Sequence, residues 1–177
     1  MAKVVSFTNK KGGVGKTTTV VNMAAYCADF GKRMLLIDLD SQGNATTGMG
    51  FSKSALKKSV YNVLIEDEKV SANILPTQIP LLDILPANVD LTGAEVELVY
   101  KRNRDRILKT ALEEVKDRYD YIFIDCPPSL GLLTINAWAA SDSLIIPLQS
   151  EHYALEGVSQ LMNTISMVKQ LLNPQLM

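Results

Sequence analysis

The sequence contains few of the residues from which disulfide frameworks and clustered metal centres are built. Only two cysteines, Cys27 and Cys126, occur among 177 residues, and they lie too far apart to suggest a disulfide framework or a four-ligand metal site. For Cys126 we expect a small buried side chain. The single histidine, His152, has no nucleophile or base partner in an evident motif, so we expect it at the surface or at a helix entry.

Long hydrophobic runs and an excess of one charge are also missing. No apolar stretch reaches the ~20 residues of a membrane-spanning helix, and polar residues from Ser6 onward interrupt any signal-peptide core. We therefore expect a cytoplasmic protein without a membrane partner. The net charge of −1 argues against DNA binding through bulk electrostatics. The basic stretch 101–106 leaves a local patch open, and a solvated corner between helices is the alternative interpretation.

Apolar runs and helical periodicity alternate along the chain, which is typical of an α/β protein. The apolar runs predict strands at 3–8, 34–38, 81–85, 121–125 and 143–147. Helical spacing predicts helices at 16–30, 104–116 and 132–140 and a long amphipathic helix at the end of the chain. This order implies one α/β domain over residues 1–177, with a mostly parallel central sheet flanked by helices on both faces.

Several local predictions are finer. Thr92-Gly93-Ala94-Glu95 fits a capping box, which predicts a helix through about Tyr100. Residues 41–58 are predicted as loop with short helical pieces, and residues 60–80 are ambiguous. The apolar face of the first helix is expected to carry Val20, Met23, Ala24, Cys27 and Phe30. The apolar face of the last helix is expected to carry Leu155, Val158, Leu161, Met162, Ile165, Val168 and Leu172.

A glycine-rich segment follows the first predicted strand and opens the first predicted helix. Its spacing departs from G-x-x-x-x-G-K-[ST], because Lys10 stands where the first glycine would fall. Glycines let consecutive backbone N–H groups face a phosphate, and the helix start adds its positive dipole end. Lys16 can supply charge to the outer phosphates of ATP, and Thr17 can ligate Mg²⁺. A glycine-rich turn with incidental lysines is the alternative. The predicted nucleotide-binding residues are Lys11, Gly12, Gly13, Val14, Gly15, Lys16, Thr17 and Thr18.

Carboxylates stand at the ends of two buried strands, where parallel sheets bind their ligands. Alternation along an extended strand end would put Asp38 and Asp40 on the same side, where they could hold the water shell of a metal or orient an attacking water. A solvated strand end is the alternative. Asp125 follows another apolar strand in the Walker B arrangement, which supports Mg²⁺.

The two residues after Cys126 cannot donate a backbone hydrogen bond. Pro127 and Pro128 have no N–H, so they cannot contact a γ-phosphate in the way that a glycine at this point often does. A stiff segment is therefore predicted, and its γ-phosphate sensor, if it has one, is predicted at Ser129 or later.

These segments together resemble the ParA/MinD group of ATPases, and most closely the ParA/Soj-type partition proteins. Residues 11–18 match the deviant Walker A loop of the group, with Lys11 at the signature-lysine position. Residues 38–46 and 125–131 are similar to its second and third motifs. Residues 90–98 and 153–157 are similar to family segments outside the active site. The similarity thus covers essentially the whole chain.

The resemblance implies a slow ATPase that uses Mg²⁺ and acts in chromosome or plasmid partitioning. Two subunits would sandwich two nucleotides, and Lys11 would reach across to the phosphates of the partner. The ATP-bound homodimer would bind DNA nonspecifically at the nucleoid, and a ParB-type protein would stimulate hydrolysis. The implied catalytic residues are Lys11, Lys16 and Asp40, and the implied metal-site residues are Thr17, Asp38 and Asp125.

This sequence departs from its relatives in two ways. Lys10 stands where relatives often have glutamine, which adds positive charge beside the loop. The chain stops at Met177, whereas family members usually continue with segments that contact adenine and DNA. A C-terminal truncation, with an exposed sheet edge or apolar helix face, is therefore expected.

Two alternatives stay open beside the partition ATPase. They are a MinD-type membrane-cycling ATPase and a nonhydrolysing nucleotide-binding fragment, and the stretch 41–44 favours the partition branch over the MinD branch. An iron–sulfur relative would need paired cysteines at a dimer interface, whereas Cys27 lies within the first helical pattern.

Overall fold

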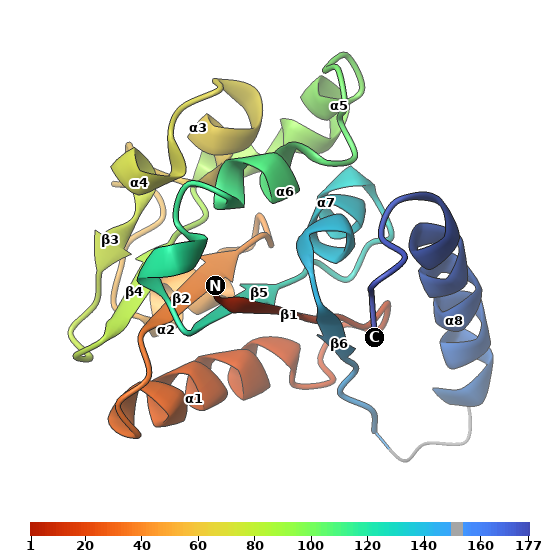
Figure 1. Cartoon of the computed structure of the whole chain (residues 1–177), viewed down its shortest axis with the longest axis horizontal. Helices are drawn as coiled ribbons and strands as arrows, with labels where there is room; N and C mark the ends of the chain where they lie inside the picture. The colour runs from red at the N-terminus through yellow and green to blue at the C-terminus, as the bar shows by residue number, and fades with distance from the viewer. Residues whose placement is uncertain (150–153) are drawn as a thin grey trace.

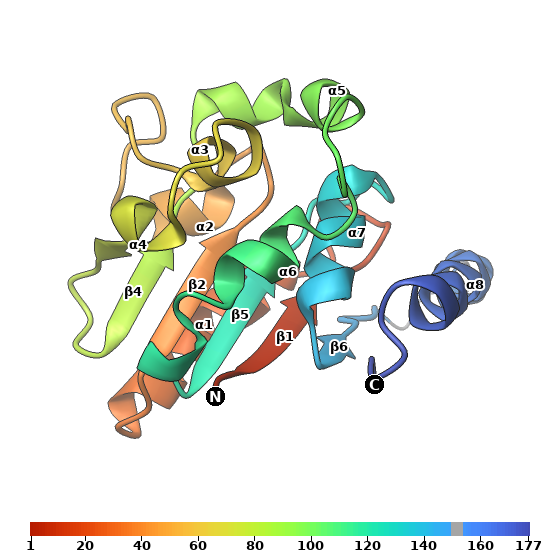
Figure 2. The same ribbon diagram turned by 45° about the horizontal axis from the view of Figure 1, so that its top comes forward.

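The computed structural model describes residues 1–149 and 154–177, and within them it forms one six-stranded sheet of order β3-β4-β2-β5-β1-β6. Neighbouring strands are parallel except for β3 and β4. The predicted mostly parallel α/β architecture is therefore confirmed (Figure 2). His152 lies outside the described residues. The strands are β1 (Lys3–Phe7), β2 (Met34–Asp38), β3 (Leu75–Pro76), β4 (Leu82–Leu85), β5 (Tyr121–Asp125) and β6 (Ser143–Ile145).

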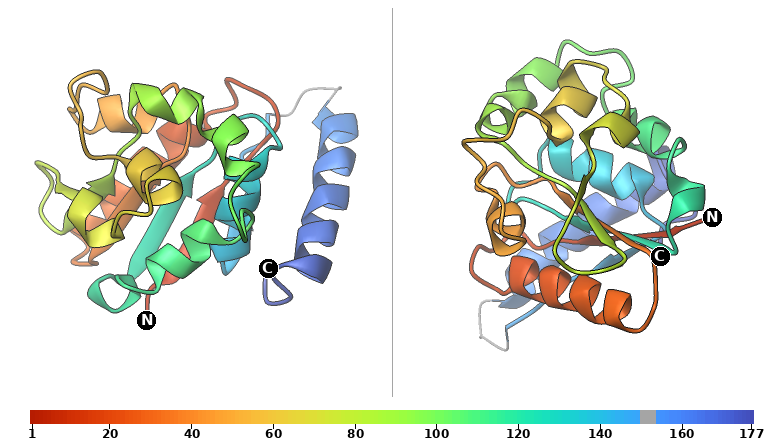
Figure 3. Two further views of the ribbon diagram at one scale, coloured as in Figure 1. Left: turned by 90° about the horizontal axis from the view of Figure 1, so that it is seen from above. Right: turned by 90° about the vertical axis from the view of Figure 1, so that its left-hand side faces the viewer.

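Helices cover both faces of the sheet. Helix α1 lies along one face, whereas α3, α5, α6 and α7 lie on the other, and α8 lies beyond α7 (Figures 1 and 3). The α-helices are α1 (Lys16–Asp29), α2 (Asn44–Gly48), α3 (Val60–Ile65), α4 (Val70–Asn73), α5 (Ala94–Leu98), α6 (Ile107–Leu112), α7 (Leu132–Ala140) and α8 (Ala154–Leu171). Two 3-10 turns, η1 (Val89–Thr92) and η2 (Lys116–Arg118), precede α5 and β5.

Alternation along the central strands fills two hydrophobic cores. In β2, Leu35 and Ile37 belong to the core that α3, α5, α6 and α7 cover. The intervening Leu36 packs in the other core, with Val20 and Ala24 of α1. Because both faces are buried, the central strands read as continuous apolar runs, and their polar residues gather at the strand ends.

The predicted capping box at residues 92–95 is wrong. Thr92 closes η1, and α5 begins at Ala94 with Gly93 as its N-cap and without a side-chain cap. The helix also ends at Leu98, short of the predicted Tyr100. The Glu95 carboxylate reaches the next layer instead, where it accepts a hydrogen bond from the backbone N–H of Leu132 in α7 at 2.7 Å. The Glu95 side chain therefore forms a tertiary contact with α7 instead of the local capping hydrogen bond that the motif predicted.

Helix α6 is shorter than the predicted 104–116, and α7 explains its start. The Asn136 side chain of α7 accepts from the Leu108 N–H at 3.1 Å and donates to the Arg104 carbonyl at 2.6 Å. This contact holds the Arg104 carbonyl outside the helix, which therefore begins at Ile107. Leu108 and Leu112 of α6 are buried, and so is Val115, which follows it.

Three strand boundaries also differ from the prediction. Strand β1 ends at Phe7, one residue before the predicted Thr8. Strand β4 begins at Leu82 because Leu81 has φ 64°, which an extended strand does not accommodate. Strand β6 ends at Ile145. The Pro147 carbonyl accepts from the Asn9 side chain rather than from a neighbouring strand.

The buried face of α1 differs from the predicted one. Val20 and Ala24 are buried as expected, together with Ala28, so the buried stripe runs at four-residue steps. The prediction that Met23 and Phe30 belong to the buried face is wrong, because their exposed fractions are 36% and 79%. Small alanines let α1 lie close to the sheet, and the larger side chains point away from it. They form an apolar groove of about 640 Å³ lined by Thr18, Thr19, Asn22, Met23, Tyr26, Cys27 and Phe30.

The last helix is amphipathic as predicted, with one exception among the described side chains. Leu161 and Val168 are buried, and Ile165 and Leu172 are partly buried against the same core. Met162 is 48% exposed, so it does not belong to the buried face. Leu155 and Val158 lie outside the described side chains.

Candidate functional site

The glycine-rich segment forms a loop between β1 and α1. Gly13 and Gly15 have φ values of 73° and 86°, which side chains with a Cβ rarely adopt. Gly15 is the N-cap of α1 and forms no side-chain cap. Val14 is buried beneath the loop and anchors it. The backbone therefore curls at the positive end of a helix dipole, as a phosphate site requires.

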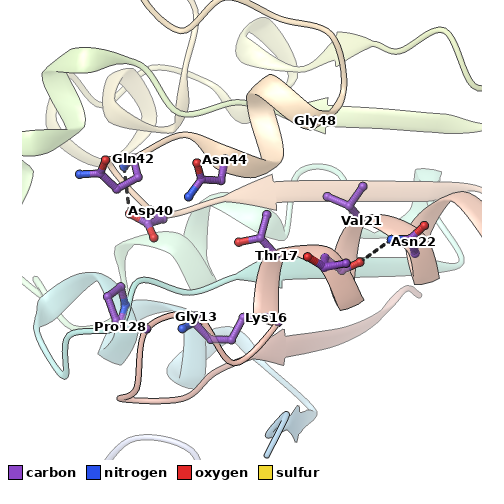
Figure 4. A pocket seen from close by; sticks show the side chains of 13 residues that line it. Gly13, Lys16, Thr17, Val21, Asn22, Asp40, Gln42, Asn44, Gly48 and Pro128 are labelled. Atoms are coloured by element: carbon purple, nitrogen blue, oxygen red, sulfur yellow. Dashed lines mark hydrogen bonds between the residues drawn. The ribbon is translucent and has the colours of Figure 1, made fainter. Parts of the chain in front are cut away.

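A cavity of about 710 Å³ opens above this loop (Figure 4). Of residues 11–18, all but Lys11 and Val14 line it, and Asp40 lies on the opposite wall. The chain thus brings together two segments that the sequence predicted to cooperate. The lining residues are Gly12, Gly13, Gly15, Lys16, Thr17, Thr18, Val21, Asn22, Asp40, Gln42, Asn44, Gly48 and Pro128.

Lys16 and Thr17 open α1 on the floor of the cavity. Lys16 is only 7% exposed, and its ammonium group donates to the Lys11 carbonyl at 3.2 Å. The Thr17 hydroxyl donates to Asp125 Oδ2 at 2.6 Å. One contact bends the lysine back over the loop, and the other links the loop to the end of β5. Lys11 itself is exposed.

Asp125 is a buried carboxylate with spare binding capacity. It is 1% exposed, and its second oxygen, Oδ1, has no hydrogen-bond partner within the described part of the chain. Burial raises the pKa of Asp125 to about 7; the Asp38 charge adds to that rise, and the Thr17 hydrogen bond opposes it. A divalent cation beside Oδ1 would satisfy the orphaned oxygen and favour the charged carboxylate. Asp125 and Thr17 therefore fit the magnesium site that the sequence predicts.

Asp38 does not share a side with Asp40, so the predicted alternation does not extend past the strand end. Asp38 Oδ1 accepts from the Asp40 N–H at 3.1 Å. Asp38 Oδ2 accepts from the Thr46 N–H at 2.8 Å and from the Thr46 hydroxyl at 2.7 Å. Burial raises the pKa of Asp38 to about 6, against these hydrogen bonds. As it lies, Asp38 supports Asp40 and the start of α2, and its role at the metal remains a prediction.

The chain after β6 holds the glycine-rich loop from outside. The Asn9 side chain donates to the Pro147 carbonyl at 2.8 Å and accepts from the Lys11 N–H at 2.9 Å. The Gln149 side chain donates to the Gly13 carbonyl at 3.3 Å. Lys10 reaches Gln160 of α8 at 2.8 Å. Except for the bond between Asn9 and Lys11, these contacts join residues 136 to 150 positions apart in sequence, so no local pattern could have predicted them.

The segment after Asp125 borders the cavity through Pro128. Cys126 is buried as predicted, and burial raises the pKa of its thiol. The Ser129 carbonyl accepts from the Thr134 hydroxyl at 2.6 Å. Neither Ser129 nor the residues up to Gly131 line the cavity, so the predicted γ-phosphate sensor remains a prediction.

Comparison with known proteins identifies the family. A family model described as an AAA domain matches residues 2–177. The sporulation initiation inhibitor protein Soj of Bacillus subtilis is 56% identical over 177 residues, which cover 100% of this chain and 70% of Soj. The chromosome partitioning protein ParA of Myxococcus xanthus is 52% identical over 176 residues, which cover 99% of this chain and 62% of that ParA. The chain belongs to the ParA/Soj group of the ParA/MinD family. It spans 62–70% of the length of these relatives.

Solved structures of similar proteins have the same fold as this chain. A cobyrinic acid a,c-diamide synthase from Mycobacterium smegmatis, with bound ADP and magnesium, is 44% identical with a TM-score of 0.95 over 99% of this chain and 71% of that one. A plasmid partition protein from Borrelia burgdorferi is 31% identical with a TM-score of 0.84 over 99% of this chain and 75% of that one. Within the described residues, no helix combines the length and apolarity that crossing a membrane demands.

Several residues that line the cavity were not among the site residues predicted from the sequence motifs. Gln42 and Asn44 lie within the second motif, so the resemblance already pointed to their segment. Val21 and Asn22 lie about one turn beyond the loop on α1; Val21 is partly buried, and Asn22 is exposed. The Asn22 side chain donates to the Thr18 carbonyl at 2.7 Å, so the four-residue spacing from Thr18 was the available signal.

Proposed function

We propose that this chain binds Mg·ATP in the 710 Å³ cavity and hydrolyses it slowly, as the nucleotide-binding part of a partition ATPase. The observation that carries the proposal is the meeting of the P-loop, with Lys16 and Thr17, and Asp40 around one cavity. The names of the curated relatives, Soj and ParA, support the partition role. The synthase name belongs to the Mycobacterium smegmatis protein, whose bound ADP and magnesium support the nucleotide site.

The P-loop holds the phosphates in this proposal. The positive φ values of Gly13 and Gly15 let the loop curl so that consecutive backbone N–H groups can face a phosphate, and the start of α1 adds its dipole. Lys16 exchanges its hydrogen bond to the Lys11 carbonyl for a charge-assisted contact with the outer phosphates. Thr17 and Asp125 would hold magnesium, which would supply positive charge to the phosphate oxygens.

Asp40 positions the attacking water in this proposal. Its Oδ1 accepts from the Gln42 N–H at 2.9 Å, which fixes the carboxylate on the wall opposite the P-loop. Its other oxygen is then available to accept a hydrogen bond from water. Asp38 holds the backbone of Asp40 from below through the 3.1 Å hydrogen bond.

The proposal includes an ATP-dependent homodimer. Lys11 is exposed and does not line the cavity of its own subunit. In this proposal its ammonium group contacts the nucleotide of a facing subunit. Such a lysine would stabilise transition-state charge in trans, in the manner of an arginine finger. Nonspecific DNA binding and stimulation by a ParB-type protein complete the proposed cycle. Both are proposed from the relatives, of whose length this chain spans 62–70%.

A nonhydrolysing nucleotide-binding module is the second candidate. One observation favours it: the chain spans 62–70% of the length of its curated relatives, and the P-loop cavity lies within that part. The two candidates differ in turnover alone. Measuring Mg·ATP affinity and phosphate release separately, with and without DNA, decides between them. Binding without release supports the second candidate, and the absence of magnesium-dependent ATP binding overturns both.

Replacing Lys11 with alanine should separate dimerisation from binding. Because the side chain lies outside the cavity, we expect Mg·ATP affinity within about twofold of wild type and turnover reduced by 10-fold or more, about the loss of one charged contact in the transition state. Light scattering with Mg·AMPPNP should show a weaker dimer. The matched control is Lys10→Ala, which removes a neighbouring lysine that bonds Gln160 instead. An unchanged dimer would refute the trans role of Lys11.

A further inference from the structure

The start of α7 is capped by a carboxylate from another helix. Its N-cap residue, Gly131, has no side chain, and its first turn carries no acidic residue. Glu95 of α5 fills this place, because its Oε2 accepts from the Leu132 N–H at 2.7 Å and its Oε1 accepts from the Leu133 N–H at 3.3 Å. A carboxylate at this end of a helix satisfies two otherwise unpaired N–H groups and complements the helix dipole.

This cap ends the loop that leaves the proposed magnesium ligand. The loop starts at Cys126, whose N–H donates to the Phe7 carbonyl at 3.1 Å, and it reaches α7 at Leu132. Pro127 and Pro128 within it have no N–H to donate, so the loop is short of backbone anchors of its own. Pro128 lines the nucleotide cavity. Inside the loop, the Ser129 carbonyl accepts from the Thr134 hydroxyl of α7. The position of the loop against the cavity therefore depends on how firmly α7 and the two ends of the loop are held.

Gly131 is required by the same contact. Its backbone angles, φ −99° and ψ −167°, are extended values that any residue adopts. A Cβ at this position would nevertheless collide with the Glu95 carboxylate, which is the nearest group to it. An alanine here would leave the backbone unstrained and push the carboxylate off α7. Gly131 and Glu95 thus form one device, which can be broken from either side.

We propose that Glu95 is a positioning residue for ATP turnover, because its cap on α7 fixes the loop of residues 126–131 beside the nucleotide. The expected effect on ATP turnover rests on the proposed function. The expected effect on the position of the loop rests only on the hydrogen bonds of Glu95. Pro128 of this loop lines the cavity and the loop forms no part of the P-loop, so we expect loosening it to affect the reacting geometry more than the affinity.

The test compares Glu95→Ala and Gly131→Ala with the matched control Glu97→Ala. Glu97 is on the same helix and carries the same charge, but its carboxylate accepts from the Tyr61 hydroxyl and does not reach α7. We expect kcat to fall about tenfold in the first two variants, since misplacement remote from the reacting atoms can cost up to about 100-fold. Their ATP affinity should stay within about twofold. Glu95→Gln should be intermediate, because its amide oxygen can accept only one of the two N–H groups in the same way.

Amide hydrogen exchange reads the position of the loop without any catalysis. In the wild type, Mg·AMPPNP should slow exchange at residues 129–131, and the Leu132 and Leu133 amides should be protected throughout. Both effects should weaken about tenfold in Glu95→Ala and Gly131→Ala and persist in Glu97→Ala. Thermal melting checks that each variant is folded.

The outcomes separate the two proposals. If the wild type binds ATP without releasing phosphate, the proposed hydrolysis falls, and the exchange of residues 129–131 still decides the positioning role. If Glu95→Ala exposes the Leu132 and Leu133 amides while loop exchange and kcat match the wild type, Glu95 is only a helix cap. An equal loss in Glu97→Ala would trace the effect to the charge of α5 and overturn the inference.

Discussion

Asp40→Ala should lower ATP turnover by at least about 100-fold while the chain still binds Mg·ATP, since a positioned acid–base group contributes about 100- to 10,000-fold. The expectation follows from where the carboxylate lies. Asp40 is held by the Gln42 N–H at 2.9 Å on the wall that faces the P-loop, and it forms no part of the phosphate cradle. Its removal takes away the group that orients water and leaves the groups that bind phosphate. Measuring phosphate release checks the expected loss of turnover, and measuring nucleotide binding checks that Mg·ATP still binds.

A second substitution and a control sharpen the Asp40 test. Asp40→Asn keeps an oxygen for the Gln42 N–H but removes the charge, so a comparable loss of turnover identifies the charged carboxylate as the active group. Asp29→Asn removes a carboxylate at the exposed end of α1, far along the helix from the loop, and should leave turnover within about twofold. If Asp40→Ala hydrolyses ATP at the wild-type rate, Asp40 does not position the water.

The strands were predictable because burial on both faces leaves a signature in the sequence. Residues 34–38 and 121–125 form β2 and β5 within their predicted bounds, since a central strand without a solvent face has no position for a polar side chain until it ends. The same reasoning placed the candidate carboxylates at the correct edge of the sheet. What it could not give was the direction of each carboxylate beyond the strand end, where alternation stops. Asp38 turned inward to Thr46, and Asp40 turned to the cavity.

Helix boundaries and the α1 face were less predictable, and tertiary contacts explain the misses. Glu95 satisfied the local pattern of a capping box, yet its carboxylate accepts from the N–H of Leu132 at the start of α7 instead. Asn136 similarly displaced the start of α6. On α1, periodicity could not decide between the stripe with Ala28 and the stripe with Phe30. The close approach of the helix to the sheet selected the smaller residue.

Lys16→Met should reduce Mg·ATP affinity and turnover by about 100-fold or more, the loss found when one preorganised donor to developing charge is removed. Lys16 is 7% exposed, so its ammonium group acts in a poorly solvated place where charge interactions are strong. Methionine keeps the apolar stem packed and removes only the charge and its hydrogen bonds. The ammonium also lowers the pKa of Asp125, so its loss favours protonation of the carboxylate that would hold magnesium.

Thermal melting with ligand measures the Lys16 effect without relying on hydrolysis. At 100 times its Kd, Mg·ATP should stabilise the wild type by about 2.7 kcal/mol, a shift of roughly 5–10 °C for a chain of this size. Lys16→Met should show almost no shift at the same concentration. Lys10→Ala is the matched control, because Lys10 bonds Gln160 and does not line the cavity, and it should keep the full shift. A full shift in Lys16→Met would mean that the lysine contributes little to nucleotide affinity, and the loop would then bind phosphate through its backbone alone.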